Sequence, residues 1–253
     1  MPVDPIHALQ AGRRGPAQGA ADAGTGTLLV AGATGALGQE LVRRLAGRHR
    51  FDHTLVLARE PIREGLSGVE TVLMPGAPID EWPLVEADTA LVLFEPPRLY
   101  YDRERALWTP APDQLPALAR WLRASGVESL AVVQPHAQGR LPEALKRGLA
   151  SLDEQAVVAE GFERVILVRT AQKPAKVRQA NPAERIANWM LSVTRFMVPS
   201  SEQPVRASKV AELVDFALRL APPGTRVMAP EMVWRASQGD VREVVEAWLA
   251  DSP

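Results

Sequence analysis

Alternation between short apolar runs and longer stretches with helical periodicity is the feature that most constrains the fold of this chain. The apolar runs are nearly continuous, as expected of strands that are buried on both faces of a parallel sheet. Such runs predict strands at residues 28–31, 53–58, 70–74, 89–94, 127–134, 164–169 and 226–229. Strands that alternate with helices in this way build a parallel sheet with helices on both faces. The predicted fold class is therefore α/β, with a doubly wound parallel sheet.

Helical stretches fill much of the chain between and after these runs. They are expected at about residues 37–47, 113–124, 142–160, 182–194, 207–220 and 238–250. The chain after Thr170 is mostly helical and lacks a strand series of its own. We therefore expect one domain over residues 27–253, in which residues 171–253 form a small, mostly helical C-terminal cap over the carboxyl edge of the sheet. Residues 1–26 lack periodicity and predict a flexible tail, with a docking arm as the alternative.

Composition excludes several classes of site. The chain contains no cysteine, which rules out disulfides, thiolate catalysis and cysteine-ligated zinc, and nothing else in it signals a metal. Lys and Arg (29) nearly balance Asp and Glu (30), so the whole chain has no electrostatic attraction to nucleic acid or to anionic lipid. No apolar run approaches the ~20 residues that span a bilayer, and no secretory signal is visible. We expect a cytoplasmic protein.

Three glycines at three-residue intervals separate the first predicted strand from an amphipathic helix. Gly32 allows a tight turn out of the strand, Gly35 allows the backbone to approach a phosphate, and Gly38 allows the helix to pack closely on the strand. The start of the helix then offers free N–H groups and the positive end of a dipole to a diphosphate. This context predicts a nicotinamide dinucleotide, with a tight turn that binds nothing as the alternative. The predicted cofactor-binding residues of the turn are Gly32, Ala33, Thr34, Gly35, Ala36, Leu37 and Gly38.

The spacing G-x-x-G-x-x-G is one residue longer in the turn than the common G-x-G-x-x-G fingerprint. Residues 28–45 (LLVAGATGALGQELVRRL) resemble the start of the atypical or extended short-chain dehydrogenase/reductase superfamily, which includes NmrA-like and NAD(P)H-binding proteins. The resemblance extends over about residues 27–220. It implies a Rossmann fold with a C-terminal substrate region.

The residue after the second strand helps to select between the nicotinamide dinucleotides, because that strand ends beside the adenosine ribose. Arg59 stands there, where the resemblance implies an NADP-selecting arginine. Its planar guanidinium suits bidentate contact with a 2′-phosphate. Glu60 follows directly and could instead bond the ribose hydroxyls. We therefore expect NADP(H), with NAD(H) as the alternative.

The catalytic pair of many relatives is absent from the sequence. These relatives use Tyr-x-x-x-Lys, in which the tyrosine transfers a proton and the lysine lowers its pKa. Neither Tyr100 nor Tyr101 is followed by lysine at the fourth position. Residues 168–170 (VRT) resemble the family's Arg-Pro-Gly, and counting back from them puts Lys146 at the tyrosine position and Ala150 at the lysine position. The departure weighs against ordinary carbonyl reduction.

Two residues are candidates for a different proton donor. His136 follows the fifth predicted strand, at the edge where ligands bind in this kind of sheet, and an imidazole titrates near neutral pH. Lys146 could also supply a proton near the nicotinamide. The alternatives are a loop histidine and a solvated helix lysine, since neither residue has a visible orienting partner.

Functions of two different classes are open. One is an NADP(H)-dependent oxidoreductase that acts on a small-molecule substrate with a non-standard proton donor, because the cofactor itself carries the hydride chemistry. The other is a non-catalytic NAD(P)H-binding sensor or scaffold with a protein partner, as the resemblance to NmrA-like proteins implies. A third reading is a degenerate Rossmann domain without a ligand. The missing Tyr-x-x-x-Lys pair favours the sensor, whereas the glycine turn serves both dinucleotide-binding functions.

Overall fold

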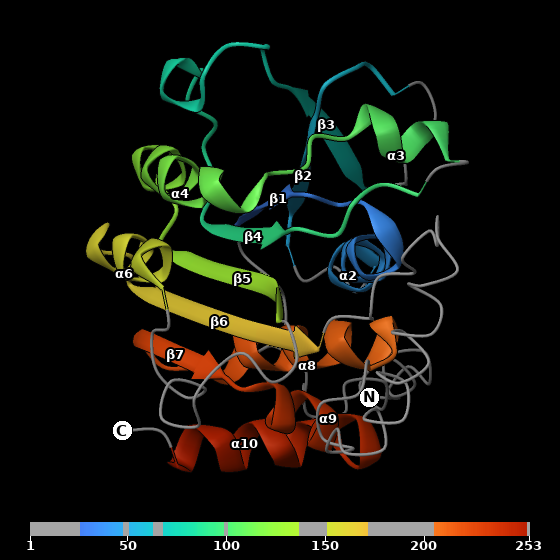
Figure 1. The fold of residues 1–253 in the computed structure, drawn as a ribbon, viewed down its shortest axis with the longest axis vertical. Helices are drawn as coiled ribbons and strands as arrows, with labels where there is room; N and C mark the ends of the chain where they lie inside the picture. Colours follow the sequence, from blue (N-terminus) through green and yellow to red (C-terminus); the bar gives the residue numbers. More distant parts are fainter. Residues whose placement is uncertain are drawn as a thin grey trace, which may run out of the picture.

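The computed structural model of this chain describes residues 26–47, 51–62, 68–98, 101–136, 151–171 and 205–251. Its strands form one seven-stranded parallel sheet in the order β3-β2-β1-β4-β5-β6-β7 (Figure 1). The strands are β1 (Thr27–Ala31), β2 (His53–Ala58), β3 (Val69–Leu73), β4 (Thr89–Leu93), β5 (Ser129–His136), β6 (Arg164–Ala171) and β7 (Gly224–Met228). The order reverses between β1 and β4, because the chain runs outward to β3 before it returns. The predicted doubly wound Rossmann-type sheet is confirmed.

Helices cover both faces of this sheet (Figure 1). The described helices are α2 (Gly35–Gly47), α3 (Asp102–Ala106), α4 (Leu115–Ala124), α6 (Leu152–Ala159), α8 (Ala207–Leu220), α9 (Pro230–Gln238) and α10 (Val241–Asp251). Two 3-10 turns precede α4 in the chain, η1 (Ile79–Glu81) and η2 (Pro112–Gln114). The described part of the C-terminal region, residues 205–251, is mostly helical.

Each face of the sheet has its own hydrophobic core, because successive side chains of a strand point to opposite faces. Leu28 and Val30 of β1 belong to the core beneath α2, α8, α9 and α10. Leu29 and Ala31 of the same strand belong to the core beneath α4 and α6. All four are fully buried, which explains why the strand reads as a continuous apolar run.

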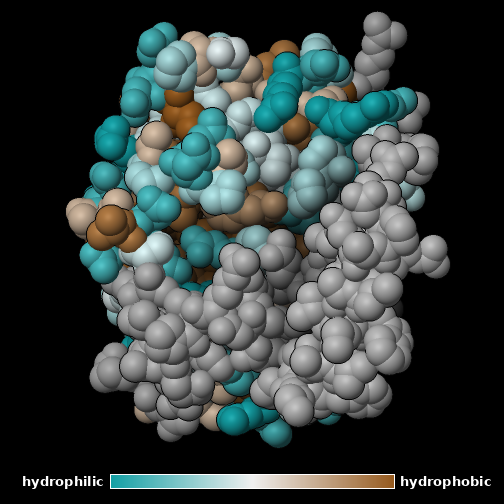
Figure 2. All heavy atoms as spheres, viewed as in Figure 1, coloured by the Kyte–Doolittle hydropathy of each residue, from teal (hydrophilic) through white to brown (hydrophobic). Residues whose placement is uncertain are grey.

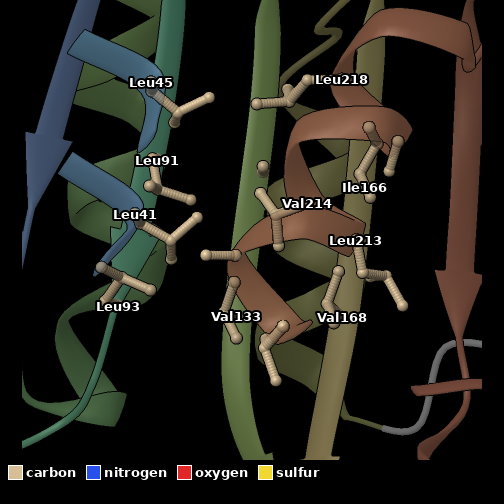
Figure 3. Close-up of a cluster of buried hydrophobic side chains, with 14 of the residues drawn as sticks. Leu41, Leu45, Leu91, Leu93, Val133, Ile166, Val168, Leu213, Val214 and Leu218 are labelled. Atoms are coloured by element: carbon tan, nitrogen blue, oxygen red, sulfur yellow. The ribbon is translucent and has the colours of Figure 1, made fainter. Parts of the chain in front are cut away.

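Helix α2, which starts at the glycine turn, packs on one face of the sheet beside α8. Figure 3 shows Leu41 and Leu45 of α2 pointing toward the same core as Leu213 of α8. A buried carboxylate adds a polar link: Asp215 of α8 accepts hydrogen bonds from Nε of Arg44 at 3.1 Å and from Nε of Arg219 at 3.1 Å. These contacts fix the body of α2 on the sheet and on α8.

The strands lie within two residues of their predicted ends, and the helix predicted at 207–220 has those bounds. The helix predicted at 142–160 is described from residue 152 onward as α6, and the helix predicted at 182–194 lies outside the described residues. Helices α3 and α9 were not predicted. Both are short, and neither is long enough to show a sustained 3.6-residue apolar period.

The described part of the C-terminal region, residues 205–251, belongs to the sheet and to one helical layer. Strand β7 extends the sheet beside β6, α8 packs on α2, and α10 packs on α8. The predicted cap over the carboxyl edge and the predicted flexible tail stay predictions, since residues 172–204 and 1–25 lie outside the described residues.

The described ranges contain neither a membrane-spanning helix nor a cluster of metal-ligating side chains. No helix there combines the length and the apolar character that a membrane span requires. In the same part of the chain, no three His, Cys, Asp or Glu side chains are grouped so that they could hold a metal ion.

A buried ion pair ties α6 to β6. Nη2 of Arg169 lies 2.8 Å from Oε2 and 3.0 Å from Oε1 of Glu154, and the two side chains are 2% and 3% exposed. Removing one partner of a buried ion pair is strongly destabilising, whereas replacing both partners with apolar residues of similar volume is often neutral or stabilising.

We expect Glu154→Leu to lower the free energy of unfolding by about 3–5 kcal/mol. The double variant Glu154→Leu/Arg169→Met should recover most of that loss, because apolar side chains then replace both members of the pair. Urea unfolding of the wild type, both single variants and the double variant measures the coupling. Additive losses in the double variant would contradict this assignment.

Candidate functional site

The glycine turn joins the end of β1 to the start of α2 at the middle of the carboxyl edge of the sheet. Gly32 and Gly35 both have positive φ, 83° and 71°. A Cβ on Gly32 would lie 2.9 Å from the carbonyl carbon of Leu93, and one on Gly38 would lie 2.6 Å from the carbonyl carbon of Ala33. Packing of backbone on backbone therefore requires glycine at positions 32 and 38 whether or not a ligand binds.

The first N–H groups of α2 already have carboxylate partners. The N–H of Gly35 donates to Oε2 of Glu104 at 3.0 Å, and the N–H of Leu37 donates to Oε2 of Glu95 at 2.8 Å. A helix N-terminus favours anions because its N–H groups lack intrahelical acceptors and because the dipole is positive there. The position at which a diphosphate was predicted thus holds two acidic side chains of the same chain.

Glu104 is fixed in its place by a network of donors. Its side chain is 1% exposed. Besides Gly35, it accepts hydrogen bonds from the backbone N–H of Arg98 at 2.9 Å, from Nε of Arg98 at 2.7 Å and from Nε2 of Gln39 at 2.7 Å. Burial raises the pKa of this carboxyl, but the Arg98 guanidinium and the N–H groups of Arg98 and Gly35 outweigh burial and lower the pKa overall.

Glu95 is held more loosely than Glu104. It directly follows Phe94 after β4, and its side chain is only half-buried. Its carbonyl oxygen accepts a hydrogen bond from the Thr34 hydroxyl, which fixes the backbone of Glu95 beside the turn. Within the described part of the chain, the hydrogen-bond donor to the Glu95 carboxylate is the N–H of Leu37.

The segment after Glu95 folds back across the carboxyl ends of β1 and β2. The carbonyl of Ala106 accepts a hydrogen bond from the N–H of Arg59 at 2.7 Å, and the carbonyl of Trp108 accepts one from the N–H of Gly32 at 3.0 Å. Figure 1 shows α3, which carries Glu104, beside the start of α2. In Figure 2, hydrophilic residues gather over α3 on the face that is drawn. The segment is therefore anchored where β1 and β2 end.

The predicted site residues fall into three groups. The turn residues lie between β1 and the first turns of α2, with Ala33 and Thr34 buried and Ala36 exposed, and their role in cofactor binding stays a prediction. Arg59 is exposed and follows β2 at the carboxyl edge. His136 is the last residue of β5, where its backbone is paired with Ala171, but its side chain and the whole of Lys146 lie outside the described residues. Their predicted catalytic roles therefore stay predictions.

A cavity of about 400 Å³ opens next to the turn, along the carboxyl ends of β4, β5 and β6. Its walls are mainly apolar and include Leu37, Phe94, Val133 and Val210, while the Glu95 side chain lies at its border. Ligands of doubly wound sheets bind outside the carboxyl ends of the strands, at the point where the strand order reverses. The cavity lies at that edge, beside the reversal between β1 and β4.

A diphosphate does not fit the turn as it stands. A side chain at Gly35 would overlap the Glu95 carboxyl group, so the open space that a glycine normally leaves for a phosphate is filled. The N–H groups of Gly35 and Leu37 are also in use. Binding of a dinucleotide here requires that the Glu95 side chain first move away.

Sequence reasoning missed Glu95 and Glu104 as members of the site. One signal was present for Glu95: in a sheet where β4 lies beside β1, the first residues after β4 must meet the turn after β1. No comparable signal marked Glu104. Its position depends on how residues 101–108 fold back over the carboxyl ends of β1 and β2, and no sequence pattern predicted that path.

The chain was also compared with known proteins. No family model and no curated protein matches it. Similar solved structures include the Bordetella bronchiseptica enzyme WbmG in complex with NAD, with 12% identity, a TM-score of 0.47, and coverage of 93% of this chain and 79% of that one. A nucleoside-diphosphate-sugar epimerase from Staphylococcus aureus has 14% identity, a TM-score of 0.45, and coverage of 80% and 70%. These are likenesses of fold alone.

The lowered pKa of Glu104 predicts how stability depends on pH. A carboxyl whose folded-state pKa is depressed contributes stability above its unfolded pKa of about 4.3, and this contribution disappears as the pH falls through the folded value. Glu104→Gln should therefore be less stable than the wild type at pH 7, with a difference that shrinks toward pH 3. Urea unfolding across this range measures the difference, with Glu246→Gln in an exposed Arg–Glu pair as the matched control. A difference that is the same at all pH values would refute the charge-based account.

Proposed function

We propose that this chain binds a nicotinamide dinucleotide at the glycine turn and acts as a binding protein, a sensor or scaffold, rather than as a reductase. The observation that carries the proposal is that the start of α2 holds anionic oxygens on the N–H groups of Gly35 and Leu37. Those groups are therefore oriented for an anion, and they lie at the carboxyl edge where this fold binds ligands. Because the Glu95 carboxylate occupies the turn, we propose that the dinucleotide binds only after this side chain has moved away.

The proposed dinucleotide is NADP(H) in preference to NAD(H). Arg59 is exposed at the end of β2, which in a Rossmann fold is the strand that ends beside the adenosine ribose. Its backbone N–H is bound to Ala106, which fixes the start of the side chain while the guanidinium stays accessible. Glu60 is also exposed and is the residue that would favour NAD(H).

A second candidate function is an NADP(H)-dependent oxidoreductase. The cavity of about 400 Å³ beside Leu37 favours it, because a cavity of that size can take a nicotinamide ring together with a small substrate. Against it stands the absence of Tyr-x-x-x-Lys from the sequence, which leaves only His136 and Lys146 as proposed proton donors.

Titration with NADPH and with NADH tests the proposal. We expect the wild type to bind NADPH more tightly than NADH. We expect Arg59→Ala to weaken the binding of NADPH by about 10- to 100-fold and to leave the binding of NADH unchanged, since a hydrogen bond to a charged group contributes about 1.5–3 kcal/mol. Arg242→Ala, on the exposed face of α10, is the matched control. Equal or tighter binding of NADH by the wild type would overturn the NADP(H) assignment.

A turnover assay distinguishes the sensor or scaffold from the oxidoreductase. The protein is incubated with NADPH and a panel of aldehydes, ketones and quinones while the absorbance of the reduced nicotinamide is followed. Binding without consumption supports the sensor or scaffold, whereas steady consumption selects the oxidoreductase. Absence of binding to either dinucleotide, also after Glu95 is replaced, would overturn both.

A further inference from the structure

We infer that the dinucleotide site is autoinhibited: Glu95 and Glu104 act as an internal substitute for the diphosphate, and release of Glu95 opens the site. This inference rests on the proposed function, because it names the device that makes dinucleotide binding conditional. It assigns different roles to the two acidic residues, a fixed one to Glu104 and a movable one to Glu95.

The contacts at the start of α2 reproduce those that a diphosphate would use. Two carboxylate oxygens lie 3.0 and 2.8 Å from the N–H groups of Gly35 and Leu37. The Glu95 carboxyl group also fills the space in front of Gly35, which is the position that must be bare for a phosphate to reach the backbone. A ligand diphosphate and the Glu95 carboxylate are therefore mutually exclusive, both by volume and by like charge.

Glu104 is not the movable element. It is 0% exposed, and its carboxylate is bound by Arg98 and Gln39 as well as by Gly35. Arg98 is itself held, since its Nη2 donates to Oε1 of Gln39 at 2.8 Å and its guanidinium lies over the Tyr101 ring at 3.9 Å. Removing Glu104 from the turn would break this whole network and leave the Arg98 guanidinium without its carboxylate partner.

Glu95 has the properties of a releasable group. Its side chain is half-buried at the border of the large cavity, so it can turn toward solvent without crossing packed core. Its backbone does not need to move, because the hydrogen bond between the Thr34 hydroxyl and the Glu95 carbonyl is independent of the carboxylate. Rotation of one side chain thus frees the Leu37 N–H and the space before Gly35, while Glu104 continues to hold the α3 segment.

Glu95→Gln is the informative variant, because it removes the charge and keeps the size of the side chain. We expect it to bind NADPH at least about tenfold more tightly than the wild type by calorimetric titration. Glu86→Gln makes the same change of net charge at an exposed position before β4, and we expect it to bind like the wild type. Equal affinities of Glu95→Gln and the wild type would overturn the inference and leave the proposed function intact.

Binding of pyrophosphate tests the autoinhibitory contact separately from dinucleotide binding. Glu95→Ala exposes the Leu37 N–H, so millimolar inorganic pyrophosphate should raise its melting temperature and leave that of the wild type unchanged. If no variant binds NADPH but pyrophosphate stabilises Glu95→Ala selectively, the proposed function fails and the autoinhibitory contact stands. If pyrophosphate affects Glu95→Ala and the wild type alike, the inference fails.

Discussion

Hydrogen bonds from the first turn of α2 to two carboxylates are the interaction on which this site depends. A helix start that points into a crevice must satisfy its free N–H groups, and in a dinucleotide-binding protein the ligand does so. Here Glu95 and Glu104 do so from within the chain. The consequence is a turn that keeps the backbone geometry of a diphosphate site, with positive φ at Gly32 and Gly35, while its anion is supplied internally.

The topology explains why these two residues arrive there. Because β4 lies next to β1, the first residues after β4 meet the glycine turn, and Glu95 is the second of them. The chain then returns over the carboxyl ends of β1 and β2 through α3, where backbone hydrogen bonds from Arg59 and Gly32 anchor it. That return brings Glu104 to the start of α2. The filled site is thus a property of the segment between β4 and α4, whereas the sheet and α2 follow the general Rossmann pattern.

The sheet could be predicted from the sequence because its strands are buried on both faces and read as continuous apolar runs, as in residues 89–93. The glycine turn could be predicted because positive φ and close backbone approach demand glycine. The acidic partners of α2 could not be predicted in the same way. Glu104 is joined to Gly35 across a long stretch of chain, and a charged residue in a short helix carries no sign that it will be fully buried. Only its partners Arg98 and Gln39 explain that burial.

Nuclear magnetic resonance of the backbone amides tests the central claim most directly. The amide proton of Leu37 reports the hydrogen bond to Glu95, and that of Gly35 reports the hydrogen bond to Glu104. We predict that Glu95→Gln shifts the Leu37 amide resonance and leaves that of Gly35 nearly in place, and that NADPH then shifts the Leu37 resonance again. A Leu37 resonance that responds neither to the substitution nor to NADPH would contradict the account.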